Sequence, residues 1–214
     1  MNYNDLLEAE IQLKQRWSCK YQWFRKQNDF WDRQSSFIYS VTTWDELNER
    51  IALQVATEGV NEKEFFQYCI NRWYNFRSAK AVENIFTSVE NVKAWKNPKS
   101  RTIDFSLHGI NFDLKTSVFP AAFSPGFEFS RNYPEKLIEW LYKNQSSQGR
   151  KHFENRLFLI VYDKNGEHWK LKAEISWLKQ IIEKYVTTFE ASSLKSFCFQ
   201  PGKQTLSDII WAIK

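Results

Sequence analysis

The chain has 214 residues and a formal net charge of +5, with 30 Lys and Arg against 25 Asp and Glu. This length can bury one hydrophobic core, and the mild basic excess favours an anionic partner such as nucleic acid. The three cysteines, Cys19, Cys69 and Cys198, lie far apart, which argues against a disulfide framework and a zinc site. The sequence begins without a secretory signal and has no apolar run that could cross a bilayer, so a cytoplasmic protein is expected.

The first third of the chain has the residue spacing of amphipathic helices. Apolar side chains recur three, four or seven residues apart between Tyr3 and Phe24, which predicts a first helix. Thr43 has a glutamate three positions later, and this capping box predicts the start of a second helix. A third helix is predicted from about Asn61 to about Val89.

Residues 102–116 have the alternation of a β-hairpin. Apolar and polar residues alternate over residues 103–107 and again over residues 110–115, so each run predicts a strand with one apolar face. His108 and Gly109 lie between the runs and predict a two-residue turn, in which glycine readily adopts a positive φ.

The register of this hairpin would place two carboxylates opposite each other. If Leu107 pairs with Ile110, then Asp104 faces Asp113, with Cβ atoms about 5 Å apart. Like charges at this separation repel, unless a divalent cation lies between them or one carboxyl is protonated. Lys115 follows Asp113 by two residues and is therefore expected on the same face.

The second half of the chain predicts further strands and helices. A proline-interrupted apolar loop at residues 118–127 precedes a helix at residues 133–142, which has Pro134 in its first turn. The apolar run Arg156–Tyr162 is typical of a buried central strand. The remaining predictions are strands at residues 169–173 and 196–200 and helices at residues 175–185 and 206–213.

The hairpin resembles the active site of the PD-(D/E)XK, or restriction-endonuclease-like, nuclease superfamily. The motif of that superfamily is an acid on one strand, then acid-X-Lys on the next strand, often with a glutamate on the preceding helix. The corresponding positions are Asp104, Asp113, Leu114, Lys115 and, on the helix, Glu83. Ile103 stands where the motif has proline, and the second acid is Asp rather than Glu.

The resemblance implies an α/β fold with a restriction-endonuclease-like αβββαβ core, in which helices flank a mixed central sheet. This core is expected at residues 61–214. Residues 1–60 would form an N-terminal helical extension.

The function implied by the resemblance is Mg²⁺-dependent hydrolysis of phosphodiester bonds, with Mn²⁺ able to substitute. Asp104, Asp113 and the backbone carbonyl of Leu114 would bind the metal, which prefers oxygen ligands. Lys115 would orient or deprotonate the attacking water and offset developing negative charge. Glu83 would hold a second metal or a metal-bound water.

The expected partner is nucleic acid, with DNA as the expected substrate of an endonuclease, and no membrane. The basic residues singled out for phosphate contact flank the hairpin, where they could hold a backbone near the metal. They are Lys99, Arg101, Arg131, Arg150 and Lys151. The residues leave open whether the protein forms a homodimer.

Two other hypotheses about the function remain open. The chain could have a nuclease-like fold that serves as a nucleic-acid-binding or assembly module without catalysis, in which the acids are vestigial and Asp104, Asp113 and Lys115 form only a structural salt-bridge cluster. Alternatively, the chain could be a protein-interaction domain that docks a partner through tryptophans of its N-terminal helices, namely Trp17, Trp23 and Trp31.

Overall fold

The computed structural model describes residues 3–25, 29–97, 100, 102–144 and 152–214. The chain divides into two compact units, one made of Met1–Ala81 with Lys172–Ser176 and the other of Val82–Leu171 with Trp177–Lys214. The change from one unit to the other falls within a single long helix, α4 (Glu62–Ser88). The assignment of residues 1–60 to an extension and 61–214 to a nuclease core stays a prediction.

The first unit is helical over its described residues. Its elements are α1 (Tyr3–Gln15), η1 (Arg16–Ser18), α2 (Asp29–Gln34), η2 (Ser36–Tyr39), α3 (Trp44–Glu58) and the larger part of α4. The capping box predicted at Thr43 is present, because the Thr43 side chain accepts a hydrogen bond from the Glu46 N–H. The Asn61 side chain caps α4 in the same way through the Glu64 N–H.

The first helix is shorter than predicted and ends at Gln15. Arg16 is fully buried, and its guanidinium donates to the carbonyl oxygens of Cys19 and Lys20 at 2.5 and 2.8 Å. These bonds satisfy backbone carbonyls just after the end of the helix, where the chain changes direction. Phe24 therefore lies beyond the helix.

Tryptophans contribute to the core of this unit. Trp31 is buried and packs edge-on against Phe65 and Tyr68. Trp73 is also buried and donates its indole N–H to the Val41 carbonyl. Indoles enclosed in this way stabilise the unit through burial and a satisfied polar group.

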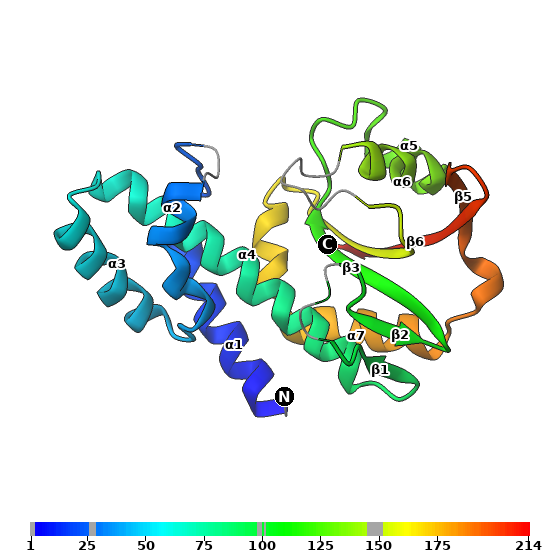
Figure 1. The fold of residues 1–214 in the computed structure, drawn as a ribbon, viewed down its shortest axis with the longest axis horizontal. Helices are drawn as coiled ribbons and strands as arrows, with labels where there is room; N and C mark the ends of the chain where they lie inside the picture. The colour runs from blue at the N-terminus through cyan, green and yellow to red at the C-terminus, as the bar shows by residue number, and fades with distance from the viewer. Residues whose placement is uncertain (1–2, 26–28, 98–99, 101, 145–151) are drawn as a thin grey trace. The chain divides into compact units, whose positions relative to one another are not determined.

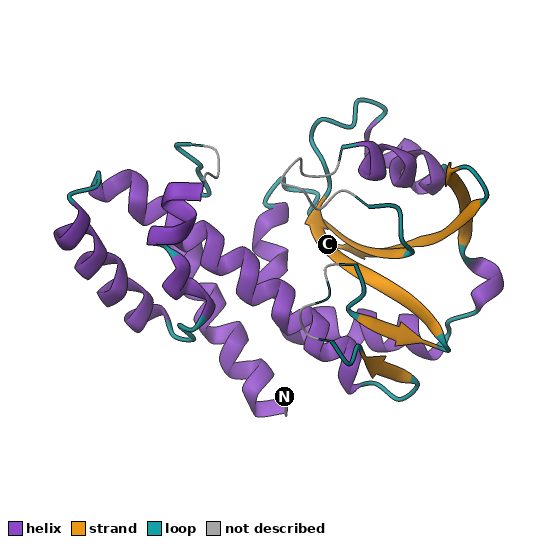
Figure 2. Ribbon diagram, in the orientation of Figure 1, coloured by secondary structure: helices purple, strands orange, loops and turns teal. Residues whose placement is uncertain are grey.

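The second unit is built on a mixed six-stranded sheet, as predicted for an α/β protein (Figures 1 and 2). In spatial order the strands are β1 (Val92–Ala94), β2 (Phe105–Leu107), β3 (Ile110–Val118), β4 (Arg156–Tyr162), β6 (Lys203–Ile213) and β5 (Lys195–Gln200). The three strands β1, β2 and β3 form an antiparallel meander, whereas β3, β4 and β6 are parallel. The central strand predicted at residues 156–162 is confirmed, and six of its seven residues are buried.

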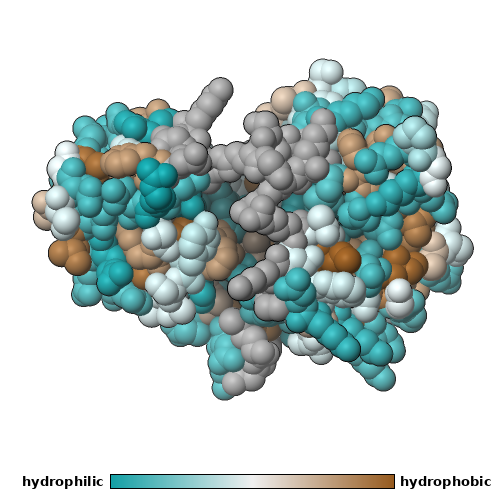
Figure 3. Space-filling model, in the orientation of Figure 1, coloured by the Kyte–Doolittle hydropathy of each residue, from teal (hydrophilic) through white to brown (hydrophobic). Residues whose placement is uncertain are grey.

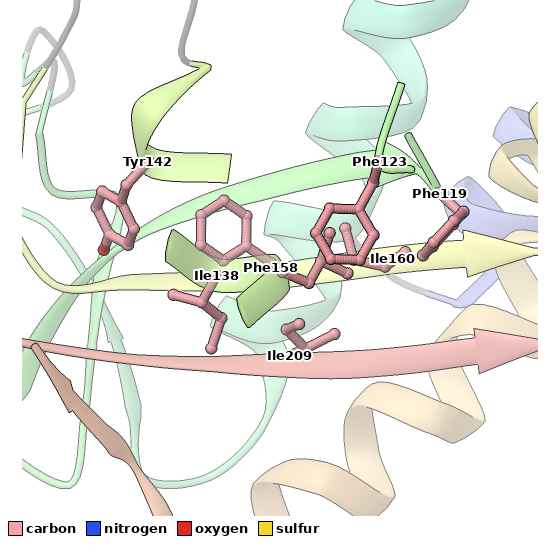
Figure 4. Packing of buried hydrophobic residues seen from close by; sticks show 8 residues of the cluster. Phe119, Phe123, Ile138, Tyr142, Phe158, Ile160 and Ile209 are labelled. Carbon is pink, nitrogen blue, oxygen red and sulfur yellow. The ribbon is translucent and has the colours of Figure 1, made fainter. Parts of the chain in front are cut away.

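Helices cover both faces of this sheet. On one face α5 (Gly126–Asn132) and α6 (Pro134–Lys143) enclose a core that includes Phe158, Ile160 and Ile209 of the sheet (Figure 4). The last turns of α4 and the helix α7 (Ile175–Thr187) lie on the other face (Figure 1). There Phe86 of α4 stacks on Phe105 of β2.

The hairpin forms with the predicted turn and with the predicted register from Phe105 to Phe112, but Asp104 and Asp113 are not a pair of the strand ladder. His108 and Gly109 both have positive φ, at 48° and 83°, as a type I′ turn requires. Leu107 pairs with Ile110 and Phe105 with Phe112. The first strand is shorter than its alternation predicted, because β2 begins at Phe105 and Asp104 lies just outside it.

Two predictions for the last third of the chain are wrong. Residues 206–213 were expected to be helical but belong to strand β6, and residues 169–173 were expected to be a strand but belong to the 3-10 helix η3 (His168–Ala173). Short apolar runs are ambiguous between helix and strand, and β6 is decided by parallel pairing with the distant β4. The helix at residues 175–185 and the strand at residues 196–200 are confirmed. Among the described residues, no helix has the length and apolar character needed to span a membrane.

Candidate active site

Asp113 is the buried centre of the candidate site. It lies on β3 opposite Arg156 of β4, and its side chain is only 2% exposed. Its Oδ1 accepts a hydrogen bond from Lys115 Nζ at 2.8 Å, and its Oδ2 accepts one from Arg156 Nε at 2.5 Å. Each carboxylate oxygen is therefore paired with a cation.

Lys115 shares a face of the sheet with Asp113, as the alternation predicted. Its strand partner is Phe158, whose ring belongs to the core under α6, so both residues lie on the α5/α6 face. The Lys115 side chain is 51% exposed. The ammonium group is thus anchored to a buried acid while remaining open to solvent and to a ligand.

Asp104 reaches the site from outside the strand ladder. Its N–H donates to the Phe112 carbonyl at 2.8 Å, and its Oδ2 accepts from the Leu114 N–H at 2.7 Å. In a regular hairpin the Leu114 N–H would bond to a backbone carbonyl of the neighbouring strand. The Asp104 carboxylate takes that place, so it lies at the edge of β3 beside Leu114.

The charges of Asp113, Lys115 and Glu83 all affect the pKa of the Asp104 carboxyl. Burial is the largest cause of the raised pKa of the Asp104 carboxyl, and the charges of Asp113 and Glu83 raise it further. The Leu114 N–H and the Lys115 ammonium oppose this shift. Glu83 acts from α4, on the other face of the sheet, and makes the smallest of these contributions.

Removing the charge at this position is expected to stabilise the metal-free protein. The raised pKa means that the folded protein holds the Asp104 proton more tightly than the unfolded chain does. Ionisation therefore lowers the free energy of unfolding as pH rises through the folded pKa, and this loss is absent below the unfolded pKa.

Asp104→Asn should accordingly increase the free energy of unfolding at pH 7, by up to about 1 kcal/mol, the range of a cross-strand charge pair. The difference should shrink as pH falls toward the ordinary carboxyl range. Urea denaturation in EDTA at several pH values measures it. A variant that is less stable than the wild type at pH 7 would place Asp104 in a stabilising salt-bridge cluster instead.

Arg156 and His152 complete the surroundings of Asp113, although the sequence predicted no contact of either residue with this acid. The Arg156 side chain is 2% exposed, and His152 Nε2 lies 2.9 Å from Arg156 Nη2 and 3.6 Å from Asp113 Oδ2. Burial and the neighbouring guanidinium lower the pKa of His152, which favours its neutral form. The sequence could have indicated Arg156, because an arginine at the start of an apolar, buried strand needs a partner for its charge.

Only one of the predicted phosphate-contact residues lies in the described part of the chain. Arg131 on α5 is exposed, and its guanidinium carbon lies 5.0 Å from the Trp211 ring centre. Lys99, Arg101, Arg150 and Lys151 lie outside the described residues.

The described residues include few side chains that could hold a metal together. Among them, no group of three or more His, Cys, Asp or Glu side chains is arranged to hold a metal. Mg²⁺, however, is commonly held by one or two carboxylates together with water and substrate phosphates. The Leu114 N–H and C=O face the same side of β3, so its carbonyl points to the edge occupied by Asp104. Asp104, Asp113 and this carbonyl fit such a donor set, and a cation would relieve the repulsion among the acids.

The excess positive charge of the chain belongs entirely to the unit that carries this site. The first unit has twelve Lys and Arg and twelve Asp and Glu. The second has eighteen Lys and Arg against thirteen Asp and Glu, a difference equal to the net charge of +5. The electrostatic attraction for a polyanion is therefore concentrated on the second unit.

Comparisons of the chain with protein-family models, with curated proteins and with solved structures found no match.

Proposed function

We propose that the protein is a metal-dependent nuclease of the PD-(D/E)XK type that acts on nucleic acid, with DNA as the expected substrate. The observation that carries this proposal is the geometry of the hairpin, in which the Asp104 carboxylate accepts the Leu114 N–H and Lys115 donates to Asp113; the charge of Glu83 also acts on Asp104. Three acids and one lysine from a helix and a hairpin are the side chains that the resemblance assigns to catalysis.

The order of elements in the second unit also supports the proposal. The helix α4 precedes the meander of β1, β2 and β3, the helix α6 follows, and β4 then pairs in parallel with β3. This is an αβββαβ order, with an additional short helix, α5, before α6. The net charge of +5 on the same unit suits a phosphate backbone.

Each residue has a distinct role in the proposed reaction. When bound, Mg²⁺ lowers the pKa of a coordinated water and so supplies a nucleophile at neutral pH. Asp104, Asp113 and the Leu114 carbonyl would hold the ion, and Glu83 would hold a second metal or a metal-bound water. Lys115, exposed beside Asp113, directs its ammonium to the phosphate and offsets charge that develops on the phosphate oxygens.

The second candidate function is a nuclease-like module that binds nucleic acid without cleaving it. The observation that favours it is the pairing of both Asp113 oxygens with cations, as in a structural salt-bridge cluster. The tryptophan-docking alternative has less support. Trp31 is enclosed in the core, and hydrophobic residues on the face drawn in Figure 3 are scattered among hydrophilic ones.

The deciding experiment is cleavage of end-labelled single-stranded and duplex DNA and RNA by the purified protein. We expect cleavage in Mg²⁺ or Mn²⁺ and none in EDTA. Binding that persists in EDTA, with no cleavage in either metal, would identify the non-catalytic module.

Nucleic-acid binding is expected to depend steeply on salt. Each phosphate neutralised by a lysine or arginine releases condensed counterions, so the logarithm of the affinity should fall linearly with the logarithm of salt concentration. Replacing Arg150 and Lys151 together by alanine should reduce the slope by about 2 if both contact phosphates. Fluorescence anisotropy with a labelled duplex in EDTA measures the slope, and unchanged binding would exclude this segment from the interface.

A further inference from the structure

Arg156 is held rigidly at the base of the site. It is the first residue of β4, its strand partner on one side is Asp113, and its carbonyl accepts a hydrogen bond from the Ser207 hydroxyl on the other. Its guanidinium carbon lies 5.0 Å from the Tyr142 ring centre and 5.6 Å from that of Phe158. Aromatic faces and strand pairing therefore leave the guanidinium little freedom to move.

The two cations on Asp113 differ greatly in their surroundings. Arg156 and Asp113 are each 2% exposed, whereas Lys115 is 51% exposed. Breaking a buried ion pair leaves an uncompensated charge in the interior and is far more costly than breaking a partly exposed one. The Oδ2 contact with Arg156 is therefore the lasting one, and the Oδ1 contact with Lys115 is the one that can exchange.

We propose that Arg156 is a positioning residue that holds Asp113 by Oδ2, so that Oδ1 alone exchanges between the Lys115 ammonium and a divalent cation. This inference rests on the proposed function. Asp113 then binds the cation through one oxygen, and cation binding releases Lys115 from the acid toward the phosphate. The same lysine serves as counter-ion in the metal-free protein and as phosphate contact in the loaded one.

The first test measures Mn²⁺ affinity without nucleic acid, by the electron paramagnetic resonance signal of free Mn²⁺. Because the ammonium competes for Oδ1, Lys115→Met should bind Mn²⁺ about two- to fivefold more tightly than the wild type. Lys203→Met is the matched control, since Lys203 is 46% exposed and pairs with Glu154 rather than with Asp113. An affinity for Lys115→Met that is unchanged, weaker, or no higher than that of Lys203→Met would overturn the exchange.

The second test replaces the positioning cation while keeping its charge. Arg156→Lys cannot reproduce the planar guanidinium contact, and loss of a group that orients a metal ligand lowers metal affinity about 10–100-fold. Ile160→Val on the same strand is the control for a modest loss of core stability, and it should bind Mn²⁺ like the wild type. Wild-type Mn²⁺ affinity in Arg156→Lys would refute the positioning role. If that variant does not fold, the Lys115→Met test, at a half-exposed side chain, decides alone.

The outcomes separate this inference from the proposed nuclease function. Mn²⁺ binding with the expected changes in both variants, but without cleavage of any nucleic acid, would support the inference and reject the nuclease. Metal-dependent cleavage with unaltered Mn²⁺ affinity in both variants would support the nuclease and reject the inference. A wild-type protein that binds no Mn²⁺ would overturn both.

Discussion

Lys115→Ala is expected to lower the rate of Mg²⁺-dependent cleavage by about 10²–10³-fold, the usual effect of removing a group that acts on developing charge. The alanine variant loses the ammonium that would face the phosphate, while both acids and the Leu114 carbonyl stay in place. Its side chain is half exposed, so the fold should not depend on it. Single-turnover cleavage with saturating Mg²⁺ isolates the chemical step from metal and substrate binding.

Lys203→Ala is the matched control for this measurement. Lys203 is exposed to a similar degree, belongs to the same unit and forms an ion pair with Glu154 rather than with Asp113. We expect this variant to cleave at the wild-type rate. If Lys115→Ala also cleaves like the wild type, the activity either resides at another site or belongs to a contaminating nuclease.

Asp104→Asn is expected to abolish cleavage at ordinary Mg²⁺ concentrations by weakening metal binding. The amide keeps the size of the carboxyl group and an oxygen that can accept the Leu114 N–H, but it lacks the charge that attracts the cation. High concentrations of Mn²⁺ should restore part of the rate. Cleavage rates over a range of Mg²⁺ and Mn²⁺ concentrations measure the loss and its recovery.

Asp208→Asn controls for the loss of a partly buried carboxyl from the same sheet. Burial also raises the pKa of Asp208 on β6, and its carboxyl group accepts a hydrogen bond from Tyr185 of α7. This variant should keep the metal dependence of the wild type. An Asp104→Asn protein that is less stable without metal and equally active with it would indicate that Asp104 has a structural role.

The contrast between these two predictions distinguishes the proposed nuclease from a nucleic-acid-binding module. In a nuclease, the loss in Lys115→Ala should persist at saturating metal, whereas the loss in Asp104→Asn should depend on metal concentration. In a module without catalysis, neither variant can lose cleavage, and both should change only stability or binding. The variants therefore test separate physical roles, transition-state charge and metal affinity.

Local patterns in the sequence determined the parts of the fold that depend on near neighbours. Helix caps at Thr43 and Asn61 follow from side chains that reach an N–H three residues away. The hairpin register follows from strict alternation and a turn at His108 and Gly109 that tolerates positive φ. The same alternation placed Lys115 on the face of Asp113, and this depends only on the strand period of two.

Contacts between distant segments decided the rest, and a sequence pattern cannot specify them. The apolar run of β6 fits the period of a helix as well as that of a strand, so the sequence predicted a helix there. Only the pairing with β4 makes this segment a strand. Asp104 leaves the ladder because its carboxylate replaces a strand partner at the Leu114 N–H. Arg156 becomes part of the site because parallel pairing puts it opposite Asp113, 43 residues earlier in the chain. The sequence alone thus indicated the acids and the lysine as candidates, whereas the tertiary structure decided which cations neutralise Asp113, since a buried charge requires a partner that is close in space.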